Sequence, residues 1–196
     1  MTRVSAVLLN YRRAHHMPRI VESLRQHEFV DDITIFNNGD PLEIEGANVI
    51  GVGRNVVTYG RFLAVNHAKH SVIFTQDDDV VVRNVPQLFS RFLSQHKKPF
   101  LQLGWGSVFN RDWIHVLNRW IDCYGEDELL CRKADRIFTT LYGAHDPIPG
   151  DFERLTDPVT GRDSDRDAHS LWLRDDHKLL TNTAVEKALA LRDGSA

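Results

Sequence analysis

Short apolar runs alternate with helical patterns over the first half of the chain. The apolar runs are typical of buried strands, and they cover Val4–Asn10, Ile33–Phe36, Ala47–Val52 and Ser71–Thr75. The helical patterns start at Pro18, cover Thr58–His70 and cover Val85–Gln95, and Asp31-Asp32 end the first helical unit. Because strands that alternate with helices pair in parallel, this order predicts an α/β fold with a mixed, mostly parallel sheet flanked by helices.

The second half of the chain has a less regular pattern. It predicts a glycine-interrupted strand at Phe100–Phe109, a short helix or strand at Trp113–Trp120, and helices at Gly125–Leu141 and Thr183–Leu191. Residues 144–166 are rich in Pro, Gly and Asp and predict a long loop. A loop of this length in a compact domain is usually functional, so we expect a lid over a binding site.

Length and composition limit the class of protein. The chain has 196 residues, 42% of them hydrophobic, which predicts one folded globular domain. The net charge is -3 and no run of Lys or Arg occurs, so no nucleic-acid partner is expected. Cys123 and Cys131 are expected to be reduced thiols. No stretch approaches the roughly 20 apolar residues that span a bilayer, and no signal-peptide core occurs, so we expect a cytoplasmic protein without a membrane span.

Three consecutive carboxylates, Asp77-Asp78-Asp79, follow the strand at Ser71–Thr75. In an open α/β sheet, ligands bind outside the carboxyl ends of the strands. Adjacent carboxylates repel one another unless a cation lies between them, and Mg²⁺ or Mn²⁺ on such oxygens usually shares its ligand shell with phosphates. The alternative is a solvated acidic turn that caps the next helix. Apolar residues on both sides, including Val80–Val82, favour a fixed metal–diphosphate site.

Several segments, in this order, resemble the GT-A superfamily of glycosyltransferases, in its family-2-like or exostosin-like branches. They are VSAVLLNYRR, DDITIFNNGD and GRNVVTYGRFLAVNHAKHSVIFTQDDDVVV, the last of which ends in a DXD-like motif. The resemblance implies a single GT-A-like, Rossmann-related domain over residues 1–196. Residues 1–99 would bind the nucleotide sugar, and residues 100–196 would bind the acceptor and carry the lid at about 144–166. It also implies transfer of a sugar from a UDP- or GDP-sugar, with Mn²⁺ or Mg²⁺, to a glycan, lipid-linked or small-molecule acceptor.

The resemblance implies roles for residues of the first half. Asn10, Tyr11, Arg12 and Asn38 would line the base and ribose pocket, Asn55 and Arg61 would flank the donor, Asp77 and Asp78 would contact the substrate, and Asp79 would hold the metal. Simpler alternatives are a turn-forming role for Asn38, core packing for Tyr11 and a surface charge for Arg61.

The second half carries looser matches to the same enzymes. Asp127, in the acidic start of the helix at Gly125–Leu141, is the candidate catalytic carboxylate, and plain stabilisation of the helix N-terminus is its alternative. It would act as a base in an inverting enzyme or bind the acceptor in a retaining one, and Asn37-Asn38 lean toward retention. The remaining candidates are His177 as a metal ligand, with His169 and His145 as alternatives, Trp105 as a floor for a sugar, and Arg162, Arg166 and Arg174 as phosphate-binding groups.

Two other functions are compatible with an acidic strand end. A nucleotidyltransferase that makes sugar nucleotides usually has a glycine-rich basic loop after its first strand, whereas this chain has NYRRAHH there. A non-catalytic nucleotide- or carbohydrate-binding module would use the three aspartates only to hold a cation. The sequence favours the transferase over both.

Overall fold

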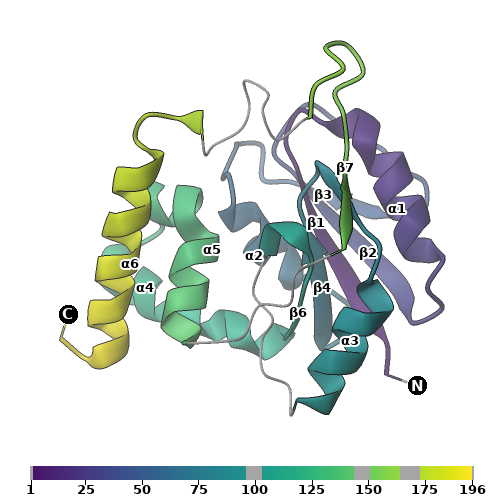
Figure 1. Cartoon of the computed structure of the whole chain (residues 1–196). Coiled ribbons are helices and arrows are strands. Elements are labelled where there is room, and N and C mark those ends of the chain that lie inside the picture. Colours follow the sequence, from purple (N-terminus) through teal and green to yellow (C-terminus); the bar gives the residue numbers. More distant parts are fainter. Residues whose placement is uncertain (1, 96–102, 144–150, 164–172, 196) are drawn as a thin grey trace.

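Five strands form the central sheet of the computed structural model, which describes residues 2–95, 103–143, 151–163 and 173–195 (Figure 1). The sheet has the strand order β3-β2-β1-β4-β6, in which β6 is antiparallel to β4 and the other pairs are parallel. Its strands are β1 (Val4–Asn10), β2 (Val30–Asn37), β3 (Asn48–Ile50), β4 (Val72–Gln76) and β6 (Ser107–Asn110). The predicted mixed, mostly parallel sheet is therefore confirmed.

Helices cover both faces of the sheet (Figure 1). They are α1 (Met17–Arg25), α2 (Tyr59–Val65), α3 (Val85–Ser94), α4 (Val116–Tyr124), α5 (Glu128–Tyr142) and α6 (His177–Asp193). Alternate residues of β1 separate two apolar cores, because successive side chains of a strand point to opposite faces. Ala6 and Leu8 pack with α1 and α3, and Val7 packs with the other four helices. None of the helices among the described residues is long and apolar enough to cross a membrane.

Several predicted boundaries shift in the structure. The prediction that Asp31-Asp32 precede the second strand was wrong, because β2 begins at Val30. Asp32 is accommodated at the start of that strand by accepting hydrogen bonds from the Ser5 hydroxyl and the Lys69 amide. The second helix is shorter than predicted, and α6 starts at His177 rather than at Thr183. Cys123 and Cys131 are free thiols.

The predicted loop at 144–166 contains a short strand, β7 (Phe152–Arg154). It pairs with β5 (Val80–Val82), which directly follows the three aspartates, in an antiparallel two-stranded sheet. Sequence patterns miss such a strand because its partner lies about 70 residues earlier and it has only three residues. The parts of the loop at 144–150 and 164–166 lie outside the described residues, so the lid remains a prediction.

The order of the strands creates a crevice between β1 and β4. From β1 the chain moves outward to β2 and β3, and it then returns to the opposite side of β1 as β4. Such a reversal separates the loops that follow the two adjacent strands and leaves a space at their carboxyl ends. Here those loops are 11–13 and 77–79, which the sequence predicted as parts of one site.

Candidate functional site

Asp78 joins the two loops at the crevice. Its carboxylate accepts a hydrogen bond from the Tyr11 amide (2.8 Å) and forms an ion pair with Arg13 Nη1 (2.7 Å). The side chain is buried, which raises the pKa of Asp78, while Arg13 and the Tyr11 amide oppose that rise. Asp78 therefore holds the two loops together. Asp77 and Asp79 are the carboxylates of the triplet that remain for a ligand.

Asp77 rests on a buried arginine. Arg61, in α2, is fully buried and pairs through Nη2 with Asp77, while its Nη1 donates to the Thr75 hydroxyl (3.2 Å) and the Leu103 carbonyl (2.5 Å). Gly104 lies against the same carboxylate, and a Cβ at that position would come within 2.3 Å of Asp77 Oδ2. Arg61 is thus neither a surface charge nor a direct ligand contact: it supports the pocket floor from beneath.

Asp79 lies next to the Arg13–Asp78 pair. Its Oδ2 is 3.8 Å from Arg13 Nη1, and its backbone carbonyl accepts a hydrogen bond from Leu155, just after β7. The imidazole of His16 contacts the Asp78 carbonyl (2.8 Å) and the Thr156 carbonyl (3.2 Å). The β7 segment therefore holds the acidic loop from outside, and Arg13 and His16 are site residues that the sequence analysis missed.

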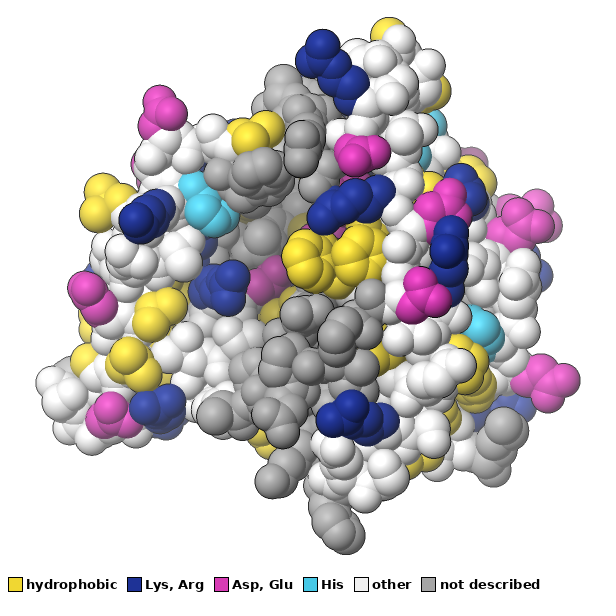
Figure 2. Space-filling view, viewed as in Figure 1, with side chains coloured by type: hydrophobic (Ala, Val, Ile, Leu, Met, Phe, Trp, Pro, Cys, Tyr) yellow, Lys and Arg dark blue, Asp and Glu magenta, His cyan; other side chains and the backbone are white. Residues whose placement is uncertain are grey.

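A cavity of about 1010 Å³ opens over these carboxylates. Figure 2 shows a hollow in this face where acidic side chains lie between basic ones. Residues from both halves of the chain line it. The predicted site residues that line it are Tyr11, Asn38, Asn55, Asp77, Asp78, Asp79, Trp105, Arg174 and His177.

Three predicted contacts with substrate lie outside the cavity lining. Asn10 is buried and donates to Asn37 Oδ1 (2.8 Å), so it connects β1 and β2. Arg12 is exposed and places its guanidinium over the Tyr11 ring at 5.2 Å. Arg61 lies beneath the floor. These three side chains therefore contact other residues of the site rather than the cavity itself.

Asn38 and Asn55 shape the wall near Tyr11. Asn38 accepts a hydrogen bond from the Val56 amide (2.9 Å) and donates to the Val57 carbonyl (3.0 Å), which fixes the loop that leads into α2. Asn55 accepts from the Val57 amide (2.8 Å) in a local turn. Asn38 therefore joins two distant loops rather than forming a local turn, and both asparagines face the cavity.

Asp127, the predicted catalytic residue, caps a helix and does not line the cavity. Its Oδ1 accepts hydrogen bonds from the Leu130 amide (2.7 Å) and from Trp120 Nε1 (3.2 Å). The bond from Leu130 is that of a helix N-cap, which satisfies an amide that has no partner within the helix, and the bond from Trp120 ties α4 to the start of α5. In the structure Asp127 thus stabilises the helix N-terminus, which is the alternative that the sequence analysis gave for it.

Asp135 is the cavity carboxylate of α5 that the sequence analysis missed. Helical geometry is interrupted at Lys133, and two residues later Asp135 faces the cavity beside Arg61. Its Oδ1 lies 3.7 Å from Arg61 Nε, and neither atom has a hydrogen-bond partner among the residues that the structure describes. Burial raises the pKa of Asp135 to about 6, with Asp77 adding to the rise and Arg61 and Arg136 opposing it. Such a carboxylate is poised to exchange a proton near neutral pH.

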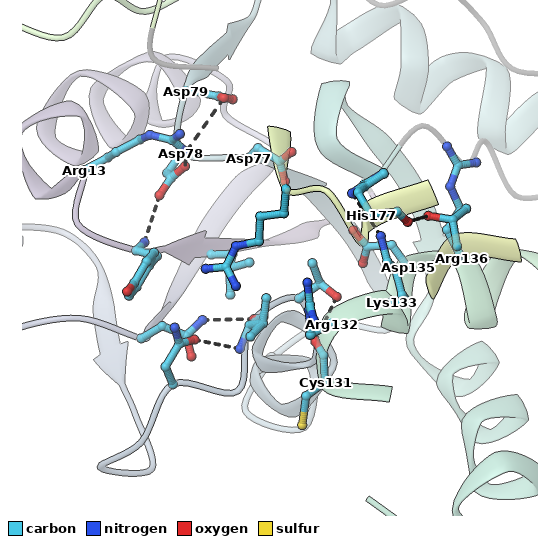
Figure 3. Close-up of a pocket in the computed structure, with 18 of the residues that line it drawn as sticks. Arg13, Asp77, Asp78, Asp79, Cys131, Arg132, Lys133, Asp135, Arg136 and His177 are labelled. Carbon is cyan, nitrogen blue, oxygen red and sulfur yellow. Dashed lines mark hydrogen bonds and ion pairs between the residues drawn. The ribbon is translucent and has the colours of Figure 1, made fainter. Parts of the chain in front are cut away.

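The wall formed by α5 and the start of α6 is basic (Figure 3). Arg132 forms two hydrogen bonds of 2.7 Å with Asp176, and Lys133 Nζ lies 3.0 Å from His177 Nδ1. Burial, followed by the charges of Arg132 and Arg136, lowers the pKa of Lys133 to about 8. Which of the two nitrogens donates in this contact depends on the tautomer of His177, so His177 as a metal ligand stays a prediction.

Trp105 adds an aromatic surface to the cavity. Its ring is 41% exposed and stacks on Phe152 of β7 with centroids 5.2 Å apart. The guanidinium of Arg154 lies 5.7 Å from the Trp105 centroid. Trp105 is therefore not a core residue, and its exposed face is available for a sugar or a base.

The oxygen donors fit Mg²⁺ or Mn²⁺ only together with a ligand. Within the described residues, no group of three or more His, Cys, Asp or Glu side chains forms a ready-made metal site. Mg²⁺ in phosphate-binding enzymes is usually held by one or two carboxylates, and substrate phosphates complete its shell. Asp79 matches that smaller donor set, because Asp78 is already paired with Arg13 and Asp77 with Arg61. His145 and His169 lie outside the described residues.

Solved structures share this fold, although no protein-family model and no curated protein sequence matches the chain. S. aureus TarS 1–349 in complex with UDP-GlcNAc has a TM-score of 0.52 at 10% identity over 98% of this chain and 73% of that one. The mannosyltransferase PcManGT from Pyrobaculum calidifontis, in complex with GDP-Man and Mn²⁺, has a TM-score of 0.52 at 10% identity over 98% and 74%. The predicted α/β fold, with a mostly parallel sheet flanked by helices, is thus shared with these solved structures.

The chain is shorter than the proteins that it resembles. For S. aureus TarS 1–349 in complex with UDP, the TM-score is 0.51 at 13% identity, with 72% of this chain and 55% of that chain covered. The chain spans only 37% of a longer TarS structure. At these identities the likeness establishes the fold, and the chemistry has to be argued from the residues of this chain.

Proposed function

We propose that this chain is a divalent-metal-dependent glycosyltransferase that uses a nucleotide diphosphate sugar. The observation that carries the proposal is the pair of carboxylates, Asp77 and Asp79, at the floor of a large cavity where the sheet changes direction. That place is where open α/β sheets bind nucleotides. The structures with the same fold hold UDP, UDP-GlcNAc, and GDP-Man with Mn²⁺.

The donor lies on the β1–β4 side of the cavity in this proposal. Tyr11, Asn38 and Asn55 border the nucleoside, Asp77 faces the ribose, and Asp79 holds the metal. When bound, the metal supplies a Lewis acid that stabilises the negative charge of the departing diphosphate. Asp78 and Arg13 contribute by keeping both loops in place, because their ion pair joins the ends of β1 and β4.

Asp135 replaces Asp127 as our candidate for the catalytic carboxylate. It faces the cavity, whereas the carboxylate of Asp127 caps the start of α5 and accepts a hydrogen bond from Trp120 of α4. As a base, Asp135 takes the proton of an acceptor hydroxyl while that oxygen bonds to the anomeric carbon and the bond from this carbon to the diphosphate breaks. A direct displacement of this kind inverts the configuration of the anomeric carbon.

Donor use can be tested with a panel of sugar nucleotides and Mn²⁺. In a thermal-unfolding screen, a donor at one hundred times its Kd stabilises the protein by about 2.7 kcal/mol, and this stabilisation should require the metal. Asp79→Asn should abolish the shift, whereas Asp112→Asn, an exposed carboxylate outside the cavity, should keep it.

The products of the reaction separate the proposed function from its alternatives. A transferase releases a nucleoside diphosphate, slowly with water and faster with an acceptor. Release of a nucleoside monophosphate would identify a phosphohydrolase, and formation of a sugar nucleotide from a nucleoside triphosphate would identify a nucleotidyltransferase. Metal-dependent binding without any turnover would leave the non-catalytic module as the function.

A further inference from the structure

The α5–α6 wall of the cavity carries more positive than negative charge. Arg132, Lys133 and Arg136 come from α5, and Arg174 comes from the segment before α6. Arg132 is neutralised by Asp176 and, at 3.4 Å, by Glu128. Across the part of the chain that the structure describes, no carboxylate forms an ion pair with Lys133, Arg136 or Arg174. Three cations therefore face the cavity without a direct ion pair to a described carboxylate, and only the more distant charges of Asp135 and Asp176 act on them.

Lys133 is the most unusual of the three cations. The residue is only 5% exposed, and its ammonium contacts His177 rather than a carboxylate. Lys is almost never buried without an opposite charge, because removing an ammonium from water is costly. The charges of Arg132 and Arg136 add to that cost, and the charge of Asp176 offsets a smaller part of it. A bound anion would offset both the cost of burying the ammonium and its repulsion by the two arginines.

These cations lie across the cavity from the proposed donor phosphates. In Figure 3, Asp78, Asp79 and Arg13 lie on one side, Lys133, Arg136 and His177 lie on the other, and Asp77 is between them. The cavity volume of about 1010 Å³ is at the upper end of the range for a single small-molecule site. There is therefore room for an anionic group that does not belong to the donor.

We propose that Lys133, Arg136 and Arg174 bind a phosphate group of the acceptor, so that the acceptor is a phosphorylated or phosphodiester-containing molecule. An ammonium and two guanidinium groups around one space suit the several oxygens of a phosphate. The inference rests on the proposed function, because it places the donor phosphates at Asp79. It names the acceptor class, and it moves Arg174 from the donor phosphates to the acceptor.

Calorimetry on the full chain tests this inference. The protein is first saturated with Mg²⁺ and the nucleoside diphosphate that binds best in the thermal screen, and glucose 6-phosphate is then titrated, with glucose as the uncharged control. The expected result is binding of glucose 6-phosphate that weakens with added salt, and no binding of glucose. Arg136→Gln should weaken the affinity for glucose 6-phosphate at least fivefold, and Lys133→Met at least tenfold.

Arg54→Gln is the matched control, because Arg54 lines the same cavity but already lies 3.7 Å from Glu126. Its affinity for glucose 6-phosphate should stay within twofold of the original. Competition between glucose 6-phosphate and the nucleoside diphosphate would overturn the inference. Equal affinity of Arg136→Gln, Lys133→Met and Arg54→Gln for glucose 6-phosphate would overturn it too. Failure of every nucleoside diphosphate to bind would instead overturn the proposed function. Arg136→Gln changes an exposed side chain, so the inference remains testable if Lys133→Met does not fold.

Discussion

Asp135→Asn should make the protein more stable and less active. In the fold, burial raises the pKa of this carboxyl from 3.8 to about 6. Each pKa unit corresponds to about 1.36 kcal/mol, so ionising Asp135 in the folded chain costs about 3 kcal/mol more than in the unfolded chain. Asparagine cannot ionise and has nearly the same shape. Arg61 retains Asp77, Thr75 and the Leu103 carbonyl as partners in the variant.

The sign of the pH dependence follows from the raised pKa. Between pH 3.8 and about 6 the folded chain holds the Asp135 proton more often than the unfolded chain does, so this residue lowers stability as the pH rises through that window. The free energy of unfolding of Asp135→Asn should therefore match that of the original chain near pH 4. It should exceed it by up to about 3 kcal/mol at pH 8.

Urea unfolding at pH 4.5 and pH 8, followed by circular dichroism, measures this difference. Asp112→Asn, which changes an exposed carboxylate, should show no such dependence on pH. Transfer by Asp135→Asn should fall by about 100-fold or more, which is typical for loss of a general base. In the original chain, kcat/KM should decline below pH 6. A variant that is equally destabilised at both pH values, or that keeps full activity, would refute the reasoning.

Three further substitutions test other parts of the site. Asp127→Ala should cost about 1 kcal/mol in urea unfolding through loss of the helix cap, with transfer reduced less than tenfold; a loss comparable to that of Asp135→Asn would return the catalytic role to Asp127. Gly104→Ala should weaken nucleotide binding in calorimetry, because its Cβ would come within 2.3 Å of Asp77 Oδ2, and unchanged affinity would contradict this. Lys133→Met should raise the Tm at pH 7, and the gain should shrink as the pH rises above 8, where the native lysine loses its charge; a lower Tm would show that the ammonium is well paired.

The side of the cavity formed by the ends of β1 and β4 could be predicted because its sequence signals are local. The strand Val4–Asn10 was predicted with its exact bounds, and the three aspartates directly follow a strand that the sequence also identified. Apolar periodicity and turn residues act over a few positions, so they can be found without knowing the fold. The rule that ligands bind at strand carboxyl ends then brings loops 11–13 and 77–79 together.

The other side could not be predicted, because it depends on contacts between distant parts of the chain. Asp127 and Asp135 lie on the same predicted helix, and the sequence does not show which of them faces the cavity. The interruption of helical geometry at Lys133 and the packing of α5 on α6 decide that. The Arg13–Asp78 ion pair joins residues 65 positions apart, and β7 pairs with a strand from the other half of the chain.

The buried guanidinium of Arg61 gives the two sides of the cavity a thermodynamic connection. It lies between Asp77, on the proposed donor side, and Asp135, on the proposed acceptor side, and the negative charge of Asp77 contributes to the raised pKa of Asp135. A cation arriving with the donor would offset that charge and favour loss of the Asp135 proton. By reciprocity, acidification would weaken donor binding to the same degree. Near pH 6, where Asp135 is about half ionised, binding on one side of the cavity would thus change the protonation state of a carboxylate on the other side.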